Sequence, residues 1–244
     1  MADGLQDVDY ADWLNGSLES ARVVVPLVVS AVEPKSVVDV GCGLGAWLVA
    51  FQEAGVDDVL GVDAPWVEQA QLLIPPERFL AADLRERFDA GRRFDLAVCL
   101  EVAHILPPEA AEPLVLSLAA LADVVLFGAA IPGQGGIEHH NEQWPAYWAE
   151  RFAAHGYAAT DPFRAAVWLH PHLKWWFAQN LVCFAQPGAI AARPALSGAA
   201  CPEIGPLPLV HPGCLAEANA RVAELEAAPR EERPSRFGLR RRRD

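Results

Sequence analysis

The sequence has little lysine, tyrosine and methionine, and it has no long uncharged apolar run. Its 244 residues include 2 lysines against 17 arginines, with 3 tyrosines and 1 methionine. We attribute the arginine excess, together with abundant alanine, to genomic GC bias. No apolar stretch approaches about 18 residues without a charge or a proline, so no membrane-spanning helix is predicted. The first ten residues, MADGLQDVDY, lack the basic and apolar regions of a secretory signal.

Paired cysteines are absent as well. The five cysteines, at positions 42, 99, 183, 201 and 214, form no C-x-x-C pair. Three of them lie in or beside predicted strands, which favours buried, reduced thiols and a cytoplasmic protein.

The acidic balance argues against nucleic acid as a partner. The formal net charge is −13, and residues 1–229 alone carry −17 because residues 230–244 hold seven arginines against three acids, a local charge of +4. Phosphate contacts need a basic face, which a body this acidic does not provide. We interpret the run Arg240 to Arg243 as solvated or folded back on the acidic body, rather than as a nucleic-acid or lipid site.

The most informative stretch is SVVDVGCGLGAWL, residues 36–48. A short β-branched run is typical of a buried parallel strand. Three glycines at alternate positions then allow a sharp turn and a close approach of the backbone to a ligand. Helix-compatible residues follow from Ala46, so the glycines precede a helix N-terminus that presents free N–H groups to a polar or anionic ligand.

Two families use such a turn. Residues 41–46 satisfy the dinucleotide fingerprint G-x-G-x-x-G/A, with Asp63 about 20 residues further on. The longer string VDVGCGLGAW, however, resembles motif I of class I S-adenosylmethionine (SAM) methyltransferases. LGVDAPW (60–66), AADL (81–84) and FDLAVCLEVAHIL (94–106) resemble the second, third and fourth motifs, and NEQWPAYW (141–148) with KWWFAQN (174–180) is similar to a bacterial subgroup. The resemblance covers roughly residues 20–186.

The resemblance implies SAM as cofactor and assigns its contacts. Asp63 ends an apolar run, so its carboxylate is expected at the carboxyl edge of the sheet, bonded to the ribose hydroxyls. Asp83 is expected at the adenine amino group, and Asp39 at the glycine turn or the methionine amino group. A helix N-cap is the alternative role for each acid. Trp66 and Leu84 are expected to sandwich the adenine ring. The predicted cofactor-binding residues are Asp39, Gly41, Gly43, Gly45, Asp63, Ala64, Trp66, Asp83, Leu84 and Leu100.

Histidines are the catalytic candidates, because an imidazole titrates near neutral pH and can take a proton from a hydroxyl acceptor. His104 follows the fourth strand, where many relatives have E-x-x-E-H; it stands in place of the second glutamate, and Ile105 in place of the histidine. A buried structural role is the alternative. His139 and His140 follow a glycine-rich stretch that suits a lid. His139 matches a histidine of the resembling subgroup and is preferred.

A metal site is a second hypothesis for the same region. Glu101, His104 and either His139 or His140 would make a two-histidine, one-carboxylate set. Relatives with E-x-x-E-H in quinone biosynthesis use a divalent ion. Such an ion would acidify a substrate hydroxyl. The preferred prediction has no metal.

Three segments are predicted. Residues 1–35 form a helical cap with helices from Val8 to Leu14 and from Ser17 to Val32, the second interrupted by Pro26. Residues 36–186 form the SAM-binding catalytic domain. Residues 187–244 form a Pro/Gly-rich linker, a short helix from Leu215 to Ala227 and an arginine-rich tail. Strands are predicted at 36–40, 58–62, 78–82, 94–100, 123–130, 157–163 and 180–186. Helices are predicted at 45–55, 66–73, 84–88, 109–122, 142–155 and 172–178.

The sequence thus predicts a Rossmann-like α/β fold with a seven-stranded, mostly parallel sheet whose last strand is antiparallel. The predicted function is methyl transfer from SAM to a small molecule, on a hydroxyl oxygen, in secondary-metabolite or sugar tailoring. The predicted protein is cytoplasmic, without membrane or nucleic-acid partners, and a homodimer is the oligomer considered. One rival is a nicotinamide-dependent oxidoreductase, disfavoured because no Y-x-x-x-K pair exists. Other rivals are a SAM-dependent rearrangement or cyclisation and a non-catalytic SAM-binding protein.

Overall fold

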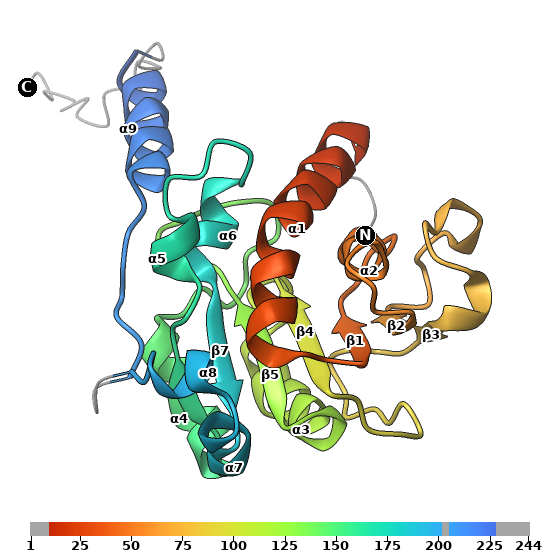
Figure 1. The fold of residues 1–244 in the computed structure, drawn as a ribbon. Helices are drawn as coiled ribbons and strands as arrows, with labels where there is room; N and C mark the ends of the chain where they lie inside the picture. The colour runs from red at the N-terminus through yellow and green to blue at the C-terminus, as the bar shows by residue number, and fades with distance from the viewer. Residues whose placement is uncertain (1–9, 202–204, 228–244) are drawn as a thin grey trace, which may run out of the picture.

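The fold is seen in a computed structural model that describes residues 10–201 and 205–227, with side chains from residue 16 to residue 225 outside the gap. The described chain forms a seven-stranded sheet of order β3-β2-β1-β4-β5-β7-β6 (Figure 1). The strands are β1 (Ser36–Val40), β2 (Asp58–Asp63), β3 (Phe79–Ala81), β4 (Leu96–Leu100), β5 (Val124–Gly128), β6 (Ala158–Thr160) and β7 (Val182–Ala185).

Only β7 runs against its neighbours, pairing antiparallel with both β5 and β6. The other pairings, of β1 with β2 and β4, of β2 with β3 and of β4 with β5, are parallel. The predicted fold class and all seven strands are therefore confirmed, with ends that differ by a few residues. The strands β4 and β5 are buried throughout, because helices cover both faces of the sheet.

Helices pack on the two faces in separate clusters (Figure 1). One face carries α1 (Tyr10–Val32), α2 (Ala46–Glu53), α5 (Arg164–Val167), α6 (Trp175–Asn180), α7 (Pro187–Ala191) and α8 (Pro194–Ser197). The other carries α3 (Ala111–Leu121) and α4 (Pro145–Ala154). Short 3-10 turns cover Gln69–Gln71, Pro76–Arg78 and Pro108–Ala110.

The predicted interruption of the N-terminal helix is wrong. The helix α1 continues through Pro26, which is exposed, while Val25 and Val28 beside it are fully buried. Burial of that apolar face outweighs the single hydrogen bond that proline removes. The prediction of two separate helices is also wrong, because α1 runs without a break through Asn15 and Gly16. Val8 and Asp9, the first two residues of the first predicted helix, lie outside the described residues.

Two predicted helices are also replaced by turns. Residues 66–73 contain only the 3-10 turn Gln69–Gln71, and residues 84–88 form no helix. In both segments consecutive residues are exposed, so there is no apolar stripe whose burial would stabilise a helix.

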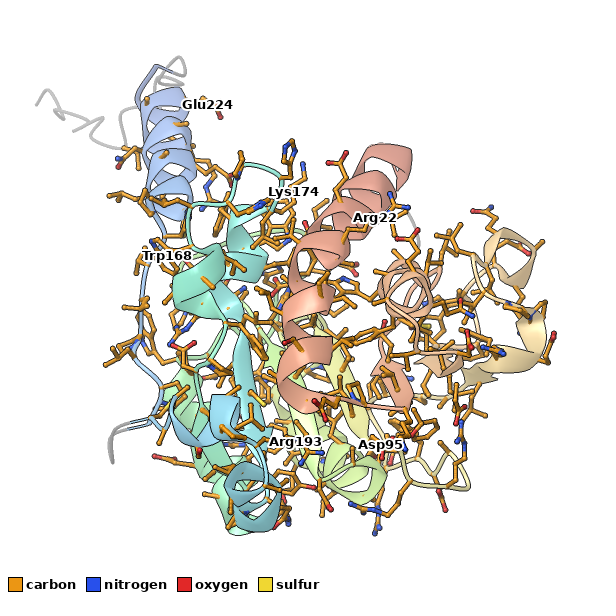
Figure 2. The ribbon with its side chains drawn as sticks, in the orientation of Figure 1. Arg22, Asp95, Trp168, Lys174, Arg193 and Glu224 are labelled. Carbon is orange, nitrogen blue, oxygen red and sulfur yellow. The ribbon has the colours of Figure 1, made fainter. Side chains whose placement is uncertain are left out.

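The segment predicted as a linker begins with structure packed on the body. In α8 Leu196 is fully buried in the cluster that also holds α1. Arg193 donates from Nε to the carbonyl of Val32 at 3.0 Å, below the end of α1 (Figure 2). The predicted final helix is confirmed as α9 (Pro212–Ala227). The arginine-rich tail lies outside the described residues, and the domain boundary at residue 187 stays a prediction.

Over residues 10–201 and 205–227, no helix is both long and apolar enough to cross a membrane.

Candidate functional site

The glycine turn after β1 has the left-handed backbone that its sequence predicts. Gly41, Gly43 and Gly45 have φ angles of 81°, 53° and 89°. The turn is held to the next strand because the N–H of Gly41 donates to the carbonyl of Val62 at 2.7 Å. A Cβ on Gly41 would lie 2.1 Å from Cγ2 of Val102, so the loop after β4 packs directly on the glycine. Gly45 then caps α2.

Asp63, at the end of β2, holds this turn from the side. Its Oδ2 accepts from the N–H of Gly43 and its Oδ1 from the N–H of Ala64, both at 2.6 Å. Burial raises the pKa of Asp63, and these two hydrogen bonds oppose that rise. Each carboxylate oxygen can still accept a second hydrogen bond, so a ribose contact is compatible with this geometry.

A small cavity opens at the carboxyl ends of β1 and β4. Ser17 of α1 and Phe177 of α6 form part of its wall, and among the residues that the structure describes no Lys or Arg lines it. Two carboxyls face it, Asp39 from β1 and Glu101 from the position directly after the neighbouring strand β4. The lining residues are Ser17, Asp39, Gly41, Cys42, Leu44, Ala46, Trp47, Leu100, Glu101 and Phe177.

Both carboxyls of the cavity are hard to ionise. Burial, and then the charge of Asp63, raise the pKa of Asp39 to about 8. Burial raises the pKa of Glu101 to about 8 as well, against a hydrogen bond of 2.9 Å from the Asn180 amide. Two buried acids in a cavity that no described basic side chain lines suit a cationic ligand, whose charge would favour their ionised forms.

The sequence reasoning gave Glu101 no cofactor role. Its backbone has a φ of 59°, which is uncommon for a residue with a side chain and occurs often at functional sites. The available signal was the one used for Asp63, an acid that directly follows a buried strand.

The adenine contacts predicted from the sequence remain predictions. Asp83 makes a paired hydrogen bond with Arg85, at 2.9 Å from Nε and 2.6 Å from Nη2. The Arg85 side chain thereby lowers the pKa of Asp83 to about 2. Trp66 is 75% exposed whereas Leu84 is buried. The predicted sandwich of the adenine ring between the Trp66 indole and Leu84 is therefore not formed in this structure.

His104 is buried beneath the loop that follows β5. Its Nδ1 accepts from the N–H of Ala130 at 3.0 Å, so Nε2 carries the proton of the neutral ring. Burial, and then the charge of His139, lower the pKa of His104 to about 3. The backbone carbonyl of His104 accepts from the N–H groups of His140 and Asn141. His104 thus ties two loops together and has no free basic nitrogen.

His139 is held by a carboxylate. Its Nδ1 lies 2.7 Å from Oε1 of Glu142, and its ring packs on that of His104 with centroids 4.2 Å apart. Glu142 also accepts from the N–H groups of Gly133 and Gly135, each at 2.7 Å. Burial raises the pKa of Glu142, but the hydrogen bonds from His139 and these glycines outweigh it, so the pKa is lowered.

Glu142 is the residue that sequence reasoning missed in this loop. The spacing His-x-x-Glu was the available signal, although it does not reveal that a glycine turn brings the carboxylate back onto the ring. His140, the third histidine candidate, is exposed, as expected for neighbouring side chains that point in different directions.

The metal hypothesis gains no support from the geometry. Among the described residues, no group of three His, Cys, Asp or Glu side chains is arranged to hold a metal ion, and this includes Glu101, His104 and His139. One nitrogen of each histidine is already engaged, by Ala130 and by Glu142.

The strand order, the glycine turn and the acids at the strand ends define a class I SAM-dependent methyltransferase. The family model described as a methyltransferase domain matches residues 19–156, more than half of the chain. The chain belongs to this family, and its cofactor is SAM. The acidic cavity fits that cofactor, because SAM carries a sulfonium and an ammonium group.

Solved structures agree on the fold. DesVI of Streptomyces venezuelae is 17% identical with a TM-score of 0.52, over 74% of this chain and 99% of that one. Magnesium protoporphyrin IX methyltransferase (ChlM) of Synechocystis PCC 6803 with bound S-adenosylhomocysteine (SAH) is 17% identical with a TM-score of 0.52, over 73% of this chain and 88% of that one. The same enzyme with bound SAM has a TM-score of 0.51. No curated protein matches the sequence significantly.

Proposed function

We propose that this methyltransferase transfers the methyl group of SAM to a hydroxyl oxygen of a small molecule, with His139 as the general base. One observation carries the proposal: a carboxylate fixes Nδ1 of His139, in a loop that follows β5 at the carboxyl edge of the sheet. In parallel α/β sheets this edge is where ligands bind.

The cofactor would lie across the ends of β1, β2 and β4. Asp39 and Glu101 would face its methionine end, and Asp63 its ribose. When bound, SAM supplies an electrophilic methyl group on a sulfur that is a good leaving group. The protein must then align the acceptor oxygen with the methyl–sulfur bond, which is a task of positioning.

The loop after β5 provides the proton acceptor. With Nδ1–H donated to Glu142, the lone pair of His139 is on Nε2. The acceptor hydroxyl would give its proton to this Nε2 as its oxygen bonds to the methyl carbon. Glu142 stabilises the imidazolium that results, as a carboxylate partner does in other His-containing catalytic sites. His104 forms the floor under the ring of His139.

The surroundings of the base support an uncharged acceptor with an apolar face. Ile105, Ile137 and Trp144 flank the histidine-bearing segments and are more than 40% exposed. The acidic body supports the proposal that nucleic acid is not the acceptor. Five free cysteines, four of them buried, support a cytoplasmic location, and exposed apolar residues of α9 support a homodimer.

Substitution of the base tests this proposal. A panel of phenols and sugar alcohols is first screened with the wild type for a methyl acceptor. On that acceptor, His139→Gln should cut turnover by roughly 10²–10⁴-fold. Affinity for SAH, measured by calorimetry, should stay within about twofold, because His139 does not line the cofactor cavity. Turnover is followed as SAH formed.

The control is His155→Gln. His155 is also paired with a carboxylate, Glu112 at 2.9 Å, but at the end of α4. It should retain wild-type turnover. Equal turnover by the His139 variant and the wild type would refute the role of His139.

Chelation separates the base from the metal hypothesis. Dialysis against EDTA should leave turnover unchanged if His139 alone accepts the proton. Loss of turnover that added divalent ion restores would instead establish metal catalysis.

A further inference from the structure

The C-terminal helix α9 lies against the part of the molecule that carries His139. It rises beside α5 and α6 at the carboxyl edge of the sheet (Figure 1). Its first turns are docked on α6. Trp175 Nε1 donates to Oε1 of Glu217 at 2.6 Å, and a Cβ on Gly213 would lie 2.7 Å from Cγ of Trp175. Cys214, on the same turn, is buried.

One side chain of α9 reaches the loop of the base. Arg221 donates from Nη2 to the carbonyl of Gln134 at 3.1 Å, across 87 residues of sequence. Its guanidinium also covers Gly135, where a Cβ would lie 2.2 Å from Nη1. Gly135 in turn donates its N–H to Oε1 of Glu142, the oxygen that also binds His139.

A buried amide network ties the same loop to the cofactor cavity. Gln134 accepts at its side-chain oxygen from Gln179 at 2.8 Å, and Gln179 also donates to Asn180 at 3.1 Å. Asn180 donates to Glu101 in the cavity. Gln179 accepts from the N–H of His211, one residue before α9. Gln134 of this loop is therefore connected to Glu101 in the cavity and, through Gln179, to the C-terminal segment at His211.

We propose that α9 is part of the active site, and that Arg221 is a positioning residue. By holding Gln134 and Gly135, it would keep Glu142 against Nδ1 of His139. The proposal rests on the function proposed for His139. It implies that the C-terminal segment orients the base, although this segment lies outside residues 19–156 of the matched family.

The test compares Arg221→Ala with wild type in the full-length chain. Amide hydrogen exchange by NMR reports on the Gly133 and Gly135 N–H groups that bind Glu142. Without Arg221 the exchange of Gly135 should become about tenfold faster, because the loop opens more often. The ¹⁵N signals of the His139 ring should change from the Nδ1–H form toward a mixture of both tautomers. SAH affinity should stay within about twofold, since Arg221 does not line the cavity.

Glu224→Gln is the matched control. Glu224 lies on the same helix, further from the docked turns, with an exposed side chain (Figure 2). It should match wild type in both readouts. If Arg221→Ala does not fold, Arg221→Gln replaces it, with exchange of Gly135 expected to rise at least threefold. Unchanged exchange and an unchanged tautomer in the folded variant would overturn the proposal.

The two proposals fail differently. If Arg221→Ala loosens the loop but His139→Gln retains turnover, the proposed base is wrong and the support by Arg221 stands. If His139→Gln abolishes turnover while Arg221→Ala leaves the ring signals unchanged, the base stands and the role of Arg221 is refuted.

Discussion

At the residue scale, the acids of the site differ in charge because their partners differ. Asp83 has an arginine partner and is ionised well below neutral pH, whereas Asp39 faces a cavity that none of the described Lys or Arg side chains lines. A buried acid that lacks a positive partner is costly to the folded protein, and a cationic ligand relieves that cost. Asp39 and Glu101, which we propose to face the cofactor, therefore make the ligand-free protein less stable.

This cost has a definite pH dependence. The folded-state pKa of Asp39, about 8, exceeds the unfolded value of about 4. The folded protein therefore binds this proton more tightly, and the free energy of unfolding falls as pH rises from about 4 to about 8. Asp39→Asn removes this loss. Without ligand, the free energy of unfolding of the variant minus that of the wild type should be larger at pH 8 than at pH 5. Urea unfolding at both pH values measures it.

The exposed Asp57 supplies the control for this measurement. Asp57→Asn should follow the wild-type pH dependence. A difference between Asp39→Asn and wild type that is the same at pH 5 and at pH 8 would show that Asp39 is already ionised at pH 5.

Asp63 should contribute directly to cofactor affinity. Asp63→Ala removes a charge-assisted acceptor at the end of β2, so SAH binding should weaken by about 1.5–3 kcal/mol. The variant also loses the hydrogen bonds to Gly43 and Ala64, so calorimetry is done on material shown to be folded by circular dichroism. Unchanged affinity would remove Asp63 from the ribose site; Asp57→Ala is the control.

At the element scale, the turn between β1 and α2 depends on its neighbours as much as on its own glycines. Gly41 and Gly91 both have positive φ, at 81° and 73°, but a Cβ on Gly91 would meet no atom within 4 Å. Gly91→Ala should therefore lose about 1–2 kcal/mol of stability from backbone strain alone. Gly41→Ala should lose about 1–3 kcal/mol more, because Val102 must also move.

Urea unfolding of both variants measures this difference. Adding Val102→Ala to Gly41→Ala should recover part of the excess loss, since the clash is with the valine side chain. Equal losses of stability for Gly41→Ala and Gly91→Ala would mean that Val102 and the loop after β4 can move aside at little energetic cost.

At the scale of the whole molecule, the C-terminal segment has two parts with different roles. Residues 187–201 contribute Leu196 to the core, whereas α9 contacts α6 and the loop of His139. A chain ending after Gly188 should lose about 2–5 kcal/mol of stability, the scale of deleting a buried leucine. A chain ending after Cys201 should retain SAH affinity within about twofold.

Thermal unfolding and calorimetry on the two truncated chains decide this point. If the chain that ends after Gly188 keeps both its cofactor affinity and its stability, the predicted domain boundary at residue 187 is correct. Unfolding of the chain that ends after Cys201 would place α9 in the core of the fold.

The sequence alone determined the sheet, the glycine turn and the family. Period and composition within a few residues define a buried strand, and an acid after such a strand reaches the carboxyl edge wherever the strand packs. Local patterns did not determine whether Pro26 would break its helix, because burial of Val25 and Val28 decides that. Neither did they reveal the hydrogen bonds from Arg221 to Gln134 or from Gln179 to Gln134. These contacts join residues far apart in the chain. Tertiary packing alone brings them within reach, and so only the structure decided which groups hold His139.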